Sequence, residues 1–154
     1  MPITSTHAAD QVAVIGDVTP VAMAAGTDVS GWIDVADFHT IMAVCQTGAL
    51  GTNATFNAKL QQATSASGTS AKDITGAAIT QLTQAGTDQS NEQAVISIQS
   101  SALDVDGGFR FIQLSITVAT ATSGGSGLVL GCSPRVGPAD ANDSADVAEV
   151  VRVA

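Results

Sequence analysis

The segment 53–64 alternates between polar and apolar residues at every second position. Its apolar members are Ala54, Phe56, Ala58 and Leu60, and its polar members are Thr55, Asn57, Lys59 and Gln61. Successive side chains of a β-strand point to opposite sides, so this period of two predicts a strand with one buried face and one solvated face. Because the buried face must be covered by a second layer, the segment favours a layered β-structure over a helical one.

Further strand-like runs recur along the chain, separated by turns rich in Gly, Ser and Thr. The runs cover residues 12–15, 18–25, 31–36, 38–47, 93–99, 109–117 and 128–132. Apolar residues on both sides of 38–47 predict a central strand covered on two faces. We predict a turn at 26–28. The glycine-rich segment 123–127 predicts a hairpin turn that brings 128–132 back against 109–117.

These runs predict an all-β protein, an antiparallel β-sandwich of jelly-roll or immunoglobulin-like topology, with extended N- and C-terminal arms. The sequence does not choose between the two topologies. We assign residues 1–17 to the N-terminal arm, 18–138 to the sandwich domain and 139–154 to an acidic C-terminal arm. Two forms stay open for the last segment: an extended β-arm, or a short helix capped at Ser144.

The charge distribution indicates which partners to expect. The net charge is -9, and the five basic residues lie far apart in the sequence, so we expect no direct contact with nucleic acid, which requires clustered cations. The longest apolar runs, 21–25 and 41–45, are too short to cross a membrane, so we expect no membrane partner. Residues 1–10 lack the features of a signal peptide, which predicts folding in a reducing cytoplasm.

The candidates for catalytic chemistry are few. A nucleophilic site needs a nucleophile, a base and a group that orients the base. His7 lies in the predicted arm and His39 at a strand start, where we expect a structural role. Cys45 and Cys132 lie in apolar runs without basic neighbours, and we interpret both as inert thiols rather than as a disulfide pair. We therefore predict no catalytic residues and no enzyme activity.

Binding sites for metals or cofactors are equally weak. The cysteines and histidines lack the close spacing of a zinc site. Residues 104–107 (Asp-Val-Asp-Gly) resemble the start of a calcium loop without its later ligands, so we favour a turn, with weak calcium binding as the alternative. Trp32 is interpreted as a packing residue, with a sugar-stacking platform as the alternative. We predict no metal-binding residues, no cofactor-binding residues and no cofactor.

Several short stretches carry a resemblance to a known group of proteins. They are residues 58–69 (AKLQQATSASGT), 72–74 (KDI), 78–82 (AITQL), 103–105 (LDV), 111–114 (FIQL), 129–131 (VLG) and 134–138 (PRVGP). Together, from Trp32 to Pro138, the chain resembles small β-sandwich structural proteins encoded in the virion-assembly regions of tailed bacteriophages and prophages. The resemblance implies a capsid decoration (cement) protein, or a small accessory component of the head or tail.

A decoration protein of this kind implies particular partners and a particular location. The expected partners are the major capsid protein and further copies of this chain, as a trimer by analogy with three-fold capsid sites. The expected location is the head surface of the virion, after assembly in the cytoplasm of the host bacterium. The alternative function is a tail- or fibre-associated module that recognises a receptor or glycan through Trp32 and the turn loops. An enzyme such as a small hydrolase is the third and least supported hypothesis.

Overall fold

The computed structural model describes residues 7–153, so the first six residues of the predicted N-terminal arm and Ala154 lie outside the description. Nearly all regular structure in the described part is β. The strands are β1 (Val12–Met23), β2 (Gly26–Val29), β3 (Ile33–Asp34), β4 (Phe38–Thr47), β5 (Thr55–Ala63), β6 (Lys72–Ala78), β7 (Leu82–Thr83), β8 (Gln93–Gln99), β9 (Phe111–Ala119) and β10 (Ser123–Pro134). The short 3-10 helices are η1 (Ala8–Asp10), η2 (Ser100–Ala102) and η3 (Ala139–Asn142).

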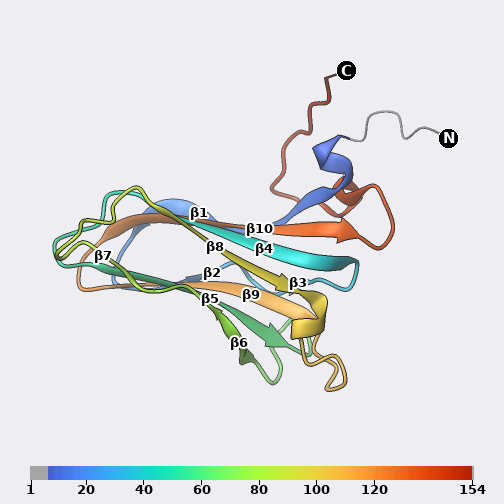
Figure 1. Cartoon of the computed structure of the whole chain (residues 1–154), viewed down its shortest axis with the longest axis horizontal. Helices are drawn as coiled ribbons and strands as arrows, with labels where there is room; N and C mark the ends of the chain where they lie inside the picture. The colour runs from blue at the N-terminus through green and yellow to red at the C-terminus, as the bar shows by residue number, and fades with distance from the viewer. Residues whose placement is uncertain (1–6, 154) are drawn as a thin grey trace.

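The strands form two antiparallel sheets that pack face to face (Figure 1). Sheet A has the order β1-β10-β4-β8, and sheet B has the order β2-β9-β5-β6. The two-residue strands β3 and β7 extend sheet B by pairing with β9 and β5. The predicted all-β antiparallel sandwich is therefore confirmed.

The order of strands also decides the topology that the sequence left open. The first strand pairs with the last, β1 with β10, and the next strand pairs with the one before the last, β2 with β9. Further along the same path, β4 pairs with β8 and β5 with β6. Strands from the two ends of the chain thus pair successively inward, and the resulting antiparallel ribbon folds into two sheets. This arrangement is a jelly roll. The chain therefore has jelly-roll and not immunoglobulin-like topology.

The core lies between the sheets and is built from the alternations that the sequence predicts. Ala54, just before β5, and the β5 residues Phe56, Ala58 and Leu60 are buried, as are Ile112, Leu114, Ile116 and Val118 of β9. Sheet A contributes Phe38, Ile41, Ala43, Cys45 and Val129 to the same cluster. Along most of β5 and β9 every second side chain lies in this core, which confirms the buried face predicted for 53–64.

The predicted turn at 26–28 is wrong, because these residues belong to β2. All four residues of β2 are exposed, and they pair with residues 115–118 of β9 at the border of sheet B. A strand in this position needs only backbone hydrogen bonds to its neighbour, so its composition resembles that of a turn. The predicted strand at 31–36 shortens to β3.

The predicted hairpin at 123–127 is also wrong. These residues form the first part of β10, which pairs with β1 and β4 in sheet A, whereas β9 lies in sheet B. Gly125 and Gly127 face inward, and a Cβ on Gly127 would lie 2.5 Å from Leu114 Cδ2. The glycines therefore let large side chains of sheet B approach the backbone of β10, a role that glycine also has in strands.

Two further predictions differ from the structure: the extent of the N-terminal arm and the burial of 38–47 on two faces. β1 begins at Val12 and pairs with β10 from Val12 onward, so residues 12–17 of the predicted N-terminal arm lie in sheet A. β4 is central within sheet A, but it is not covered on two faces, because Met42 and Val44 on its outer side are only half-buried. Since the sandwich has only two layers, this outer side faces away from the core.

Candidate functional site

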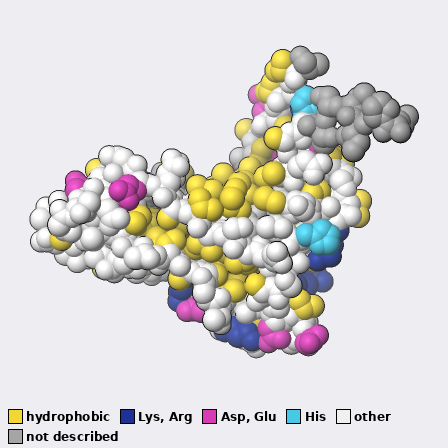
Figure 2. All heavy atoms as spheres, in the orientation of Figure 1, with side chains coloured by type: hydrophobic (Ala, Val, Ile, Leu, Met, Phe, Trp, Pro, Cys, Tyr) yellow, Lys and Arg dark blue, Asp and Glu magenta, His cyan; other side chains and the backbone are white. Residues whose placement is uncertain are grey.

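The outer side of sheet A carries an uninterrupted group of apolar side chains. We call this group the outer apolar face; it consists of Val14, Met42, Val44, Val95, Leu128 and Leu130. Figure 2 shows hydrophobic side chains gathered over the upper layer of the sandwich, below the projecting terminal segments. Val95 is 57% exposed and Leu128 is 36% exposed. In an antiparallel sandwich the solvent face of a sheet is ordinarily polar, so this face is unusual.

The strand register brings these residues together in two rows. One row runs across Leu128, Val44 and Val95, and the other across Val14, Leu130 and Met42. Side chains directly opposite each other on neighbouring strands lie in contact range. Residues from β1, β4, β8 and β10, far apart in the chain, therefore form one continuous surface.

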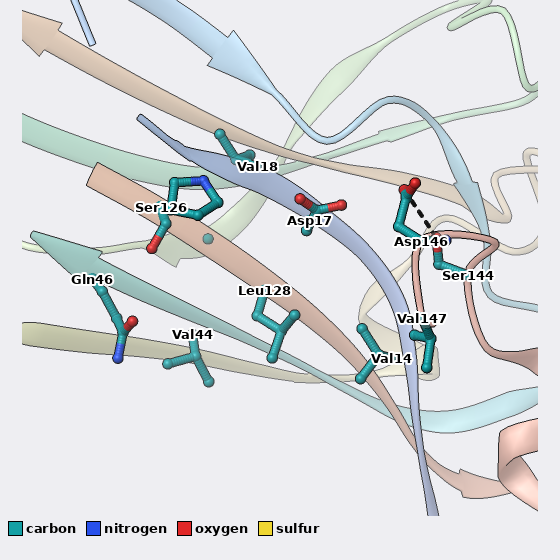
Figure 3. Close-up of a pocket in the computed structure, with 12 residues that line it drawn as sticks. Val14, Asp17, Val18, Val44, Gln46, Ser126, Leu128, Ser144, Asp146 and Val147 are labelled. Carbon is teal, nitrogen blue, oxygen red and sulfur yellow. Dashed lines mark hydrogen bonds between the residues drawn. The ribbon is translucent and has the colours of Figure 1, made fainter. Parts of the chain in front are cut away.

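A groove of about 440 Å³ crosses this face (Figure 3). Val44 and Leu128 lie along it on the neighbouring strands β4 and β10, while Val147 from the C-terminal segment faces Val14 of β1. The carboxylates of Asp17 and Asp146 lie at its border. The groove thus has a mainly apolar lining that also includes polar side chains and the two carboxylates of Asp17 and Asp146.

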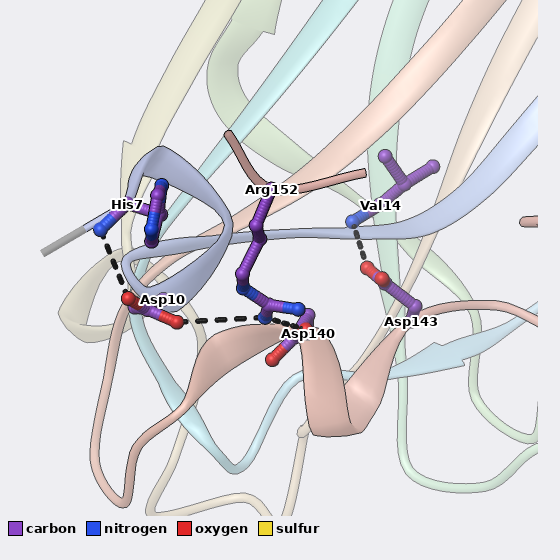
Figure 4. A network of polar contacts seen from close by, with 6 residues as sticks. All are labelled: His7, Asp10, Val14, Asp140, Asp143 and Arg152. Carbon is purple, nitrogen blue, oxygen red and sulfur yellow. Dashed lines mark hydrogen bonds and ion pairs between the residues drawn. The ribbon is translucent and has the colours of Figure 1, made fainter. Parts of the chain in front are cut away.

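The C-terminal segment is held at the border of this face by backbone contacts (Figure 4). The N–H of Val14 donates to Asp143 Oδ1 at 2.8 Å, and the N–H of Ser144 donates to the carbonyl of Val14 at 2.7 Å. The side chain of Asp143 therefore occupies a hydrogen-bonding position at the free edge of β1, where a neighbouring strand would otherwise pair.

Beyond this anchor the chain leaves the body of the sandwich (Figure 1). The 3-10 helix η3 occupies residues 139–142 and residues 143–153 hold neither helix nor strand, so neither the extended β-arm nor a helix capped at Ser144 is present. Val151 and Val153 are 72% and 81% exposed. Arg152 forms ion pairs with Asp140 and, at 3.5 Å, with Asp10 of η1, and its hydrogen bond with Asp140 raises the pKa of the guanidinium (Figure 4). Both described ends of the chain therefore lie at one end of sheet A.

The structure separates the residues considered for catalysis. His39 is exposed at the second position of β4, as expected for a histidine at a strand start. Cys45 faces the core, where burial raises the pKa of its thiol to about 11. Cys132 lies half-buried on the outer side of the sheet, and burial raises the pKa of that thiol as well. Because the two cysteines point to opposite sides of sheet A, they are free thiols.

The segment 104–107 forms part of a turn, which is the structure we favoured over a calcium loop. Asp104 Oδ1 accepts the N–H of Gly107 at 3.0 Å, and Asp104 Oδ2 accepts from Lys72 Nζ at 2.7 Å. The hydrogen bond from Lys72, and then that from Gly107, lower the pKa of Asp104. Within residues 7–153, no group of three or more His, Cys, Asp or Glu side chains has the arrangement of a metal site.

Trp32 is half-buried and packs against the loop between β5 and β6. A Cβ on Gly68 would lie 2.4 Å from Trp32 Nε1, so this edge of the indole is covered by the loop backbone. The packing role predicted for Trp32 therefore agrees with its surroundings, and only part of the ring faces solvent.

Most of the basic side chains are engaged with carboxylates. Lys59 pairs with Asp73, Lys72 with Asp104, Arg110 with Asp34, and Arg152 with Asp10 and Asp140. Arg135 donates to the carbonyl of Ala36 at 2.7 Å. The basic residues thus remain dispersed on the folded surface, as in the sequence. None of the helices found between residues 7 and 153 has the length and apolar character needed to cross a membrane.

The outer apolar face is the feature that reasoning from the sequence missed. Its signal was present in β4, where apolar residues occur on both sides of the strand, and in the leucines of β10. We interpreted that pattern as burial on two faces. In a sandwich of two layers, the same pattern means that one apolar side faces outward.

Comparisons with known proteins leave the family open. No protein-family model matches the chain, and no curated protein sequence matches it. A structure of a Cowpea Mosaic Virus empty virus-like particle is similar over 87% of this chain and 85% of its own, with a TM-score of 0.44 and 10% identity. Two structures of infectious bursal disease virus, strains Gt and Gx, are similar over 83% of this chain, with TM-scores of 0.40 and 0.37 and identities of 10% and 12%. This chain spans 33% of each of those two chains. Likeness at this level carries no information on function.

Proposed function

We propose that this protein is a structural component of a virion, a capsid decoration (cement) protein that binds the head surface through the outer apolar face. The observation that carries the proposal is the face itself, with the C-terminal segment anchored at its border. Its partner is the major capsid protein, and it acts on the virion head after assembly in the cytoplasm of the host bacterium. A trimer is proposed by analogy with three-fold capsid sites.

The first support is energetic. Burial of apolar surface contributes roughly 25 cal/mol per Å² removed from water, so a contiguous apolar face is a ready source of binding energy. Single exposed apolar residues are common, but contiguous patches mark interaction sites. Here two cross-strand rows meet, with Val44 and Leu128 at the centre. A contiguous sheet face of this kind suits a protein surface as its partner.

The second support is the tail that leaves the body beside this face. Val150, Val151 and Val153 are exposed along a segment without regular structure. An extended apolar segment can bind in grooves of a neighbouring protein, or add to its sheet edges. Together with the face, the tail gives two contacts that could bridge adjacent capsid subunits.

The third support is analogy. Jelly rolls occur in viral capsid domains and also in lectins, and the resemblance of the sequence to phage structural proteins points to the first use. We further propose that the protein is not an enzyme and that it uses no metal or cofactor. Its dispersed, mostly paired cations favour a protein partner over nucleic acid.

The proposal is tested by adding the purified protein to undecorated capsids of the phage that encodes it. We expect the protein to sediment with the particles and to raise their thermal stability. Leu128→Asp places a charge at the centre of the face and is expected to abolish co-sedimentation. Gln81→Asp, which adds the same charge at an exposed loop between β6 and β7, should bind as the wild type does. Wild-type protein that stays in the supernatant would exclude the decoration role.

The alternative is a tail- or fibre-associated module that recognises a receptor or glycan. It draws on the use of jelly rolls in lectins and on the exposed part of Trp32. Sugar sites depend on stacking rings, and Trp32 is partly covered by Gly68. Glycan-array binding that is lost in Trp32→Ala and kept in Leu128→Asp would favour this function over decoration.

A further inference from the structure

Among the described residues, four strands longer than two residues lie at the borders of the sheets, and each presents one backbone edge to its surroundings. Sheet A ends in β1 and β8, and sheet B ends in β2 and β6. An open edge can pair with a strand of another chain, so soluble proteins block such edges with charges, proline, bulges, short strands or covering segments. The four edges differ in whether they carry such a block.

Three of the edges are blocked. β1 contains Pro20 and two irregularities in its register with β10, and residues 143–144 cover it at Val14. β2 is only four residues long. β6 begins with the exposed charges Lys72 and Asp73 and has an irregular register with β5. Each of these features opposes the addition of a further strand.

The edge of β8 lacks all of them. The strand Gln93–Gln99 contains no charged residue and no proline, and its register with β4 is unbroken over seven positions. Among the described residues, no strand other than β4 pairs with β8. A groove of about 580 Å³ runs along it, bordered by residues 75–78 of β6. In Figure 1, β8 lies at the near side of the upper sheet.

The sequence of β8 has Ile96 at its centre and a glutamine at each end. An antiparallel partner of the same sequence, with Ile96 opposite Ile96, would place Gln93 opposite Gln99 and Val95 opposite Ser97. The inward residues Ala94 and Ile98 would also face each other, so the pleat of both copies is preserved. Glu92, just before the strand, would face Ser100 rather than another carboxylate.

We propose that β8 is an interface between two copies of this chain, paired antiparallel about a two-fold axis that passes between the two Ile96 residues. The occupant is a second copy because the edge is uncharged and pairs with its own copy without placing like charges opposite each other. The pairing joins two four-stranded A sheets into one continuous sheet. The outer apolar faces then meet through the exposed Val95 of each copy.

This interface does not depend on the proposed capsid role, because it forms from the purified protein alone. It is two-fold and isologous, whereas a trimer uses a different, heterologous contact. Where both contacts exist, β8 links one trimer to the next. Failure of capsid binding therefore leaves the β8 interface intact as a proposal. Likewise, a monomeric protein would leave the proposed capsid role intact.

The test is the molar mass of the full chain by size-exclusion chromatography with light scattering. We expect an even multiple of 15.3 kDa. The double substitution Val95→Lys/Ser97→Lys places lysines opposite each other across the axis, so we expect it to halve the mass. It also reduces the net negative charge of the chain, which by itself would favour association. Val95→Lys/Ser97→Glu places opposite charges across the axis and should restore the wild-type mass. Both pairs of substitutions lie at exposed positions, and circular dichroism checks that each variant is folded.

A second measurement tests the register. In a Cys132→Ser background, Val95→Cys/Ser97→Cys should form intermolecular disulfides on oxidation, because each new thiol lies opposite the other in the partner. Val95→Cys alone should crosslink far less. A wild-type protein that stays monomeric at about 1 mM, near the weak end of specific affinities, would overturn the proposal. So would a folded lysine variant with unchanged mass, or a folded lysine–glutamate variant that stays at half mass.

Discussion

The aromatic ring of Phe38 covers the inner side of Gly131 so closely that a Cβ on the glycine would lie 2.6 Å from Phe38 Cε2. The two residues lie on the neighbouring strands β4 and β10 of sheet A. Phe38 is only 1% exposed, so its ring has little room to move away. The packing of sheet A therefore depends on the absence of a side chain at position 131.

Gly131→Ala is expected to destabilise the protein by about 1–3 kcal/mol, the usual cost of forcing an extra carbon into a packed core. Chemical denaturation followed by circular dichroism measures the change. Ser126→Ala, at an outward position of the same strand, is the matched control and should change stability by less than about 0.5 kcal/mol. Equal effects of the two substitutions would contradict the close contact.

The buried thiol of Cys45 makes stability depend on alkaline pH. In the unfolded chain this thiol ionises near its ordinary pKa of 9.0, whereas burial raises the pKa in the folded protein to about 11. The unfolded state therefore loses its proton first, and stability falls as the pH rises from 9 to 11, by about 2 kcal/mol. Denaturation curves at these pH values measure the loss.

Two controls accompany the alkaline titration. Cys45→Ala should remove most of this dependence between pH 9 and 11 while lowering stability at neutral pH. Cys132→Ser should retain it, because Cys132 is only half-buried. With Ellman's reagent at pH 8, Cys132 is expected to react in the folded protein and Cys45 only after unfolding. Rapid reaction of both thiols in the native state would argue against the burial of Cys45.

The contact between Asp143 and β1 should protect the Val14 amide from solvent. Asp143→Ala removes the acceptor 2.8 Å from that N–H, so we expect faster hydrogen exchange at Val14 and a loss of stability of about 1 kcal/mol. Exchange measured by nuclear magnetic resonance reports the amide directly. Asp146→Ala removes an exposed carboxylate that bonds only within its own loop, and it should leave Val14 unchanged.

The outer apolar face should dominate adsorption to apolar media. Leu128→Thr breaks the row that Leu128 shares with Val44 and Val95, so retention in hydrophobic-interaction chromatography is expected to fall clearly. Val136→Thr removes a more exposed valine that lies outside the face, 77% exposed, and should have a smaller effect. A larger effect of Val136→Thr would mean that single exposed residues, and not the contiguous face, govern adsorption.

The strands β4 and β8 begin and end at the residues that the sequence predicts, and β5 buries the predicted side. These features depend on alternation within one segment, which can be read locally. The predictions were wrong where the amino-acid composition of a segment is compatible with two different structures. Glycines at 125 and 127 are suited to a turn and equally to a close approach between sheets, and only the position of Leu114 decides between them.

The alternating pattern of apolar residues by itself determined that this chain forms a two-layered antiparallel β-structure, because burial of every second side chain leaves few alternatives. Which strands are neighbours, and hence the jelly-roll topology, was decided only by the tertiary structure. Pairing joins residues as distant as Val14 and Leu130, and no local pattern specifies such a partner. The outer apolar face and the open edge of β8 depend on that pairing, so both became visible only in the folded molecule.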